Sequence, residues 1–66
     1  MRVRINGFFE TLPQGTSVLD VILRHEEYDV HMIVEVNHRF IHQKDYETTL
    51  LKDGDEVELI RPAFGG

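Results

Sequence analysis

The stretch MRVRINGFFETL (residues 1–12) carries the pattern on which the fold depends. Its apolar residues alternate with charged ones up to Ile5, which is the period of a strand with one buried face. Asn6-Gly7 then favours a type I′ turn, because both central residues of that turn need a positive φ. We therefore predict a β-hairpin whose second strand runs over residues 8–12.

A helix is predicted after this hairpin. Ser17 followed by Asp20 has the form of a capping box, in which each side chain binds the other residue's backbone amide. Over about residues 18–26 the apolar residues fall on one helical stripe, as expected for a helix that covers a sheet. His25 lies on the same stripe, and we expect it to be a partly buried histidine with a polar partner.

A second hairpin is predicted further along the chain. Apolar residues at every second position from Met32 to Val36 indicate a third strand. A turn at residues 37–38 leads to a short fourth strand at residues 40–41. The two hairpins therefore flank the helix in sequence.

The last strand follows an irregular polar connection. We expect three residues of this connection to anchor it in the core: Tyr46, Leu50 and Leu51. A turn at residues 53–55 then leads to a strand ending near Ile60. Pro62 is expected to stop this strand, because proline has no amide hydrogen to donate to a sheet.

This order of elements predicts an α+β fold, a mixed sheet of four to five strands with one helix packed across one face. If the first and last strands both lie near the centre of the sheet, they run parallel. Sixty-six residues make a single domain over residues 1–66. A chain of this length has a small core and little room for an internal active-site cavity, which disfavours an enzyme.

Composition excludes several classes of function. Twelve acidic residues against seven basic ones give a net charge of −5, which disfavours binding to a phosphate backbone. The absence of cysteine excludes disulfides, thiolate metal sites and thiol nucleophiles. No signal peptide and no apolar run of membrane-spanning length are apparent. We expect a cytoplasmic protein that binds neither nucleic acid nor a membrane.

The histidines and glycines do not predict a bound metal or cofactor. The four histidines form no motif with the spacing of metal ligands, and the pair His38 and His42 spans a predicted hairpin rather than one helical face. No phosphate-binding glycine motif is present, so the chain is not expected to bind ATP by itself.

Several motifs, taken in order, resemble one known family. They are the NG turn at residues 6–7, PQGTSVLDVI (13–22), VEVN (34–37) and LLKDGDEVELIRPAFGG (50–66). Together they resemble the ThiS-type sulfur carriers of the ubiquitin-like β-grasp family, and the resemblance covers essentially the whole chain. It implies a β-grasp domain with a flexible C-terminal tail of about residues 62–66.

The resemblance also implies a function. An E1-like adenylyltransferase of the ThiF type would transfer AMP from ATP to the carboxylate of Gly66. Sulfur from a donor such as a cysteine desulfurase system would then replace AMP and form a thiocarboxylate. A thiazole synthase of the ThiG type would receive this sulfur in thiamine biosynthesis. The chain would be a protein cosubstrate, and its partner would use the ATP.

The residues of the tail suit this chemistry. Gly65 and Gly66 have no Cβ, so the backbone can enter a narrow channel and adopt conformations closed to other residues. Ala63 and Phe64 are expected to enter the partner with them. Phe64 is larger than the residue that many relatives carry there, and two placements remain open: a partner's hydrophobic groove or the surface of the domain itself.

Two residues of the last strand form a candidate partner-binding patch. Ile60 and Glu58 share the outward face of the strand, and an exposed isoleucine beside a reactive tail fits a contact surface. A lone apolar residue on a surface is also ordinary.

Three alternatives remain at this point. The chain could carry sulfur for molybdopterin, cysteine or methionine synthesis, although its short length favours ThiS over the longer molybdopterin carriers. It could be a ubiquitin-like modifier joined through Gly66 to lysines of other proteins. It could also be a β-grasp binding module whose terminal glycines have no role.

Overall fold

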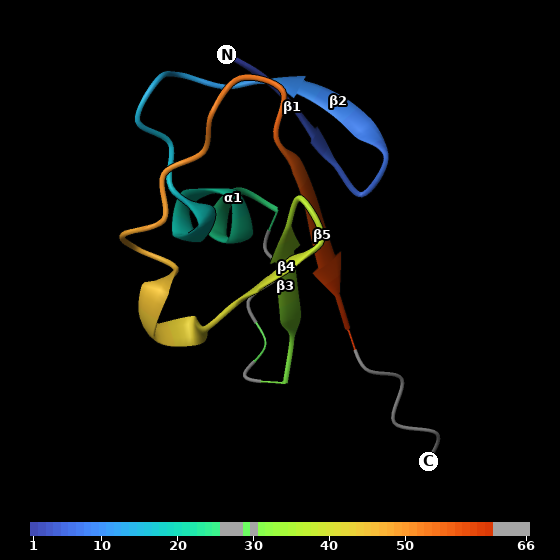
Figure 1. Ribbon diagram of the computed structural model, residues 1–66, viewed down its shortest axis with the longest axis vertical. Coiled ribbons are helices and arrows are strands. Elements are labelled where there is room, and N and C mark those ends of the chain that lie inside the picture. The colour runs from blue at the N-terminus through green and yellow to red at the C-terminus, as the bar shows by residue number, and fades with distance from the viewer. Residues whose placement is uncertain (26–28, 30, 62–66) are drawn as a thin grey trace.

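The computed structural model describes residues 1–25, 29 and 31–61, and shows a five-stranded sheet with one α-helix against it (Figure 1). The elements in chain order are β1 (Arg2–Ile5), β2 (Phe8–Thr11), α1 (Val18–Arg24), β3 (Ile33–Val36), β4 (Arg39–Ile41), the short 3₁₀ helix η1 (Gln43–Asp45) and β5 (Glu56–Ile60). The predicted mixed sheet with a single helix is confirmed, and the 3₁₀ helix is an element that the sequence did not predict.

The last strand lies in the centre of the sheet. The strand order is β2-β1-β5-β3-β4, with β5 parallel to β1 and antiparallel to β3. Ile5 is paired with Val57 in the parallel pair, and Leu59 with Val34 in the antiparallel one. The expectation that the first and last strands run side by side and parallel is therefore confirmed.

Both hairpins turn through left-handed backbone. Asn6 and Gly7 have φ values of 49° and 87°, and Asn37 and His38 have values of 52° and 65°. Positive φ at both central residues is the signature of a type I′ turn, whose twist matches that of the flanking strands. Both turns lie where the sequence predicts them.

The helix begins with the predicted capping box. Asp20 N donates to Ser17 Oγ over 3.1 Å, and Ser17 N donates to Asp20 Oδ2 over 2.9 Å. The helix ends at Arg24, with His25 as its C-cap residue, so it is shorter than predicted, and the expected end at residue 26 lies outside the described residues.

His25 is partly buried, as predicted, and its Nε2 lies 2.7 Å from Glu10 Oε2 on β2. Nε2 itself is buried, and within the described residues it makes no aligned hydrogen bond, so the contact is a close pair of ionisable groups. Arg24 approaches the other oxygen of Glu10, with 3.7 Å between Nε and Oε1. The end of the helix is thereby tied to an edge strand.

One apolar cluster fills the space between the helix and the sheet. Its buried members are Val3, Ile5, Leu12, Val18, Val21, Ile22, Met32, Val34, Val36, Tyr46, Leu51, Val57 and Leu59. The strand members alternate with exposed residues, so only one face of the sheet contributes to this core.

The prediction that Leu50 anchors the connection in the core is wrong. Tyr46 and Leu51 are buried as expected, whereas Leu50 is 57% exposed. Leu50 forms a β-bridge with Ser17, and Leu51 N donates to Thr16 O. In such an extended segment successive side chains point to opposite sides, so only one of the two leucines can face the core.

The turn before β5 is also confirmed, with Gly54 at a φ of 88°. Gly54 N donates to Arg2 O, and Arg2 N donates to Asp53 Oδ1, so the turn is fastened to the start of β1. Pro62, which was expected to end the last strand, lies outside the described residues. The described residues contain no helix with the length and apolar character that crossing a bilayer requires.

Candidate functional site

The face of the sheet that points away from the helix carries most of the candidate site. Paired residues of neighbouring strands lie on the same face, so the register defines its members. We call this surface the open face; it consists of Arg2, Arg4, Phe9, Thr11, Ile33, Glu35, Phe40, Glu56, Glu58 and Ile60.

An apolar area lies at the end of the open face where β5 finishes. Ile60 is paired with Ile33, and the two side chains are 38% and 40% exposed. Phe40, 56% exposed, lies on β4 opposite Glu35. The candidate patch residue Ile60 therefore has an apolar neighbour, Ile33, which the sequence alone did not identify.

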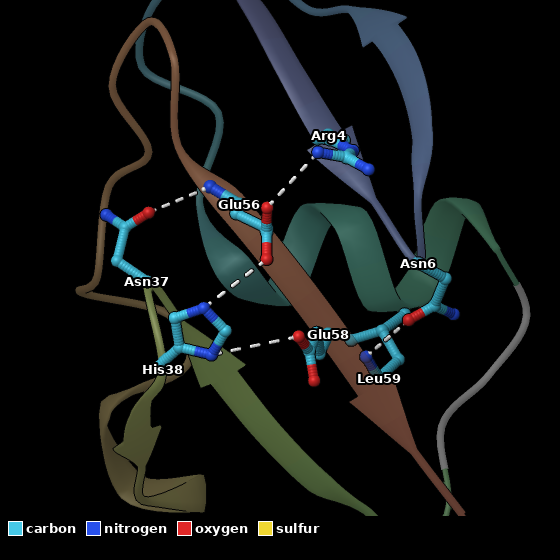
Figure 2. A network of polar contacts seen from close by, with 7 residues as sticks. All are labelled: Arg4, Asn6, Asn37, His38, Glu56, Glu58 and Leu59. Carbon is cyan, nitrogen blue, oxygen red and sulfur yellow. Dashed lines mark hydrogen bonds and ion pairs between the residues drawn. The ribbon is translucent and has the colours of Figure 1, made fainter.

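A shallow groove runs beside β5 towards Ile60. Its lining residues come from β5 and the first hairpin and are Arg4, Asn6, Gly7, Glu56, Glu58 and Ile60. Asn6 connects the first hairpin to β5 in this groove. Its side-chain Oδ1 accepts a 2.8 Å hydrogen bond from Leu59 N (Figure 2). Its backbone N donates to Val57 O. The two predicted patch residues, Glu58 and Ile60, thus line one groove.

Charged side chains converge at the other end of the groove. Arg4 Nη1 lies 3.6 Å from Glu56 Oε2, and His38 lies on the opposite side of the same carboxylate (Figure 2). His38 Nε2 is 3.6 Å from Glu56 Oε1, and its Nδ1 is 3.9 Å from Glu58 Oε1. Sequence reasoning missed this group because its members come from β1, β5 and a turn that are distant in the chain.

An aromatic ring with two cations occupies the far edge of the open face. The Arg2 guanidinium lies 4.1 Å from the centre of the Phe9 ring, and that of Arg4 lies 5.6 Å from it. The ring face attracts both guanidinium groups, which holds the two arginines over Phe9. The open face therefore runs from a basic edge, through carboxylates, to apolar residues beside the end of β5.

The remaining predicted site residues, Ala63, Phe64, Gly65 and Gly66, lie outside the described residues. They follow directly after the central strand β5 in sequence. The second histidine of the pair considered in the sequence, His42, packs edge-on against Phe40 with 4.7 Å between ring centres. His38 instead faces the two carboxylates described above.

The ThiS family model matches residues 3–66. The chain belongs to the ThiS family. The match extends through both C-terminal glycines and includes all of the described strands except the first residue of β1.

Two solved structures of a ThiS thiamine biosynthesis protein from Geobacter metallireducens are similar to this ThiS-family chain. The crystal structure is 25% identical, with a TM-score of 0.83 and full coverage of both chains. The solution NMR structure is also 25% identical, with a TM-score of 0.79, and the alignment covers all of this chain and 88% of the other. A search of curated protein sequences finds no significant match.

Proposed function

We propose that this ThiS-family chain is a sulfur carrier for thiamine biosynthesis and acts as a protein cosubstrate rather than as an enzyme. The observation that carries the proposal is the family match, which extends through Gly66 on a chain without cysteine. The similar structures from Geobacter metallireducens are described as thiamine biosynthesis proteins, and they share the fold over the whole chain.

The proposed chemistry takes place at the carboxylate of Gly66. A free carboxylate is a poor electrophile, so an E1-like enzyme of the ThiF type first activates it. The carboxylate oxygen attacks the α-phosphate of ATP, and pyrophosphate leaves. The outer sulfur of a persulfide on a donor such as a cysteine desulfurase system then attacks the carbonyl carbon of the acyl-adenylate, and AMP leaves. A thiol cleaves the S–S bond of the resulting acyl disulfide, which releases the thiocarboxylate and leaves the donor sulfur in a disulfide with that thiol. The resulting thiocarboxylate gives its sulfur to a thiazole synthase of the ThiG type.

The domain contributes position and recognition to this chemistry. Hydrogen bonds on both sides hold the central strand β5, so residue 61 and the tail that follows start from a fixed place. The groove beside β5, with Glu58 and Ile60, is the proposed contact surface for the adenylating partner. An apolar centre with charged surroundings is the usual composition of such a surface. Ala63, Phe64 and Gly65 would follow Gly66 into the partner.

Intact mass measurement tests the proposal directly. We expect incubation with ATP, a ThiF-type enzyme and a sulfur donor to replace one carboxylate oxygen of Gly66 by sulfur. Deletion of Gly66 should abolish this conversion, because the activated carboxylate would then lie one residue short of its place in the partner. The circular dichroism spectrum of the deletion variant should match that of the unaltered chain, since the buried core residues of the described part of the chain all precede Ile60.

Two results would contradict the proposal. One is an unchanged mass after incubation with an adenylating enzyme that is shown to be active on another carrier. The other is a Gly66 deletion variant that is converted as fast as the unaltered chain. Adducts joined to lysines of other proteins, in place of a thiocarboxylate, would favour a ubiquitin-like modifier.

A further inference from the structure

Two glutamates of the open face and a histidine from the turn between β3 and β4 have the chemistry and spacing of metal ligands. A ring nitrogen of His38 and one carboxylate oxygen each of Glu56 and Glu58 lie within 4.8 Å of one another. The three residues surround one point beside β5, and their side chains point towards one another (Figure 2). Within the described residues this is the one group of three or more such side chains that meets this spacing.

The fold places these three side chains together before any ligand binds. Glu56 and Glu58 are two residues apart on β5, so they project from the same face of the sheet. Asn37 joins the turn that carries His38 to this strand. Its side-chain Oδ1 accepts a hydrogen bond from Glu56 N, and its backbone N donates to Glu56 O. Its Nδ2 also donates to Asp55 Oδ1. The turn that carries His38 is therefore held beside the carboxylates by hydrogen bonds of both the backbone and the side chain of Asn37.

The charge around the three side chains favours a cation. Arg4 approaches Oε2 of Glu56, which leaves Oε1 facing His38. The ion-pair partner of Glu58 is His38, and Glu58 is paired across the sheet with another carboxylate, Glu35. Like charges in such a pair repel each other. A bound divalent ion would relieve this repulsion.

The donor set indicates which cation fits. One imidazole nitrogen with two carboxylate oxygens suits zinc and similar transition ions, whereas magnesium and calcium prefer oxygen ligands alone. Bond lengths of about 2.1 Å around a tetrahedral zinc ion set the ligand atoms roughly 3.4 Å apart. The side chain of His38 is 75% exposed and those of both glutamates are more than a third exposed, so small rotations can close the remaining distance.

We propose that His38, Glu56 and Glu58 form a binding site for a divalent transition-metal ion of the zinc type. Three protein ligands leave the fourth tetrahedral position for water. Either ring nitrogen of His38 can serve, because one faces each carboxylate. Glu58 also lines the groove proposed as the contact surface for the adenylating partner, but zinc binding to the free chain can be measured without the sulfur chemistry proposed for Gly66.

Calorimetric titration of the untagged chain with zinc chloride tests this site. We expect one zinc ion to bind per chain. His38→Asn and Glu58→Gln should each weaken binding by at least about tenfold, because each removes one ligand of three. Asparagine is chosen at position 38 because it tolerates the left-handed backbone of the turn. Circular dichroism and thermal melting should show that both variants remain folded.

The matched control is His42→Asn, which removes a histidine on the same hairpin that packs against Phe40 instead of the carboxylates. This variant should bind zinc as tightly as the unaltered chain. The proposal is overturned if the unaltered chain takes up no zinc at millimolar concentration. It is equally overturned if folded His38→Asn binds as the unaltered chain does, or if His42→Asn loses as much affinity as His38→Asn.

Discussion

The two faces of the sheet differ in what they do for the protein. On the three inner strands, the face against α1 consists of aliphatic residues that are at most 9% exposed, such as Val3, Val34 and Val57. The open face carries arginines, glutamates and partly exposed apolar residues on the same strands. Because successive residues of a strand point to opposite faces, one short segment contributes both to the core and to the proposed contact surface. Along one strand, mutations two residues apart should therefore have similar effects on stability or binding, and mutations of adjacent residues should have different effects.

The largest expected effect tests the covered face. Ile22 is fully buried on α1, and Ile22→Ala should lower the free energy of unfolding by about 2–5 kcal/mol, because it removes buried methyl groups and leaves a cavity. Urea denaturation measures this change. A loss of that size is a large share of the total free energy of unfolding of so small a domain.

Phe40→Ala is the matched variant on the open face, where the ring is 56% exposed. It should change the free energy of unfolding by no more than about 0.5 kcal/mol, as substitutions at exposed positions usually do. Equal losses in both variants would show that the open face is part of the stabilising core, and the comparison of the two faces would fail.

The second prediction concerns recognition by the adenylating partner. Ile60→Gln should lower kcat/KM for charging about fivefold or more, since an apolar contact at the centre of an interface contributes more than 1 kcal/mol when it matters for binding. Steady-state assays with varied carrier concentration measure this. Thermal melting should show that the variant is folded, because Ile60 is already 38% exposed.

Leu23→Gln is the control for this assay, since Leu23 is 57% exposed on the helix and lies on the other side of the molecule from the open face. We expect its charging kinetics to equal those of the unaltered chain. The reverse outcome, with Leu23→Gln impaired and Ile60→Gln normal, would assign partner recognition to the helix side.

The smallest expected effect concerns charge on the open face. Glu35 and Glu58 are directly paired across β3 and β5, which sets like charges side by side. Glu35→Lys should stabilise the fold by a few tenths of a kcal/mol, because it converts repulsion into attraction. The gain should shrink in high salt, which screens exposed charges. Urea denaturation at low and high ionic strength measures it, and a loss of stability at low salt would show that Glu35 makes a favourable contact.

Local features were predictable from the sequence because each depends on residues close together in the chain. Alternating apolar residues defined the strands, Asn-Gly defined the first type I′ turn, and Ser17 with Asp20 defined the start of the helix. The outward position of Glu58 and Ile60 followed from the same alternation. The family resemblance added the tail chemistry, which the fold of the domain does not test.

Tertiary structure decided how distant segments meet. Leu50 and Leu51 are equally apolar, and only the bridge from Ser17 to Leu50 determined which of them enters the core. The meeting of Arg4 and His38 with Glu56 likewise depends on the register of β1 and β3 against β5, which no local pattern records. Register between distant strands is set by the packing of all side chains of one face at once. The local sequence was therefore enough to predict the α-helix, the strands and the faces of the strands. Which side chains share a site depends on the three-dimensional fold.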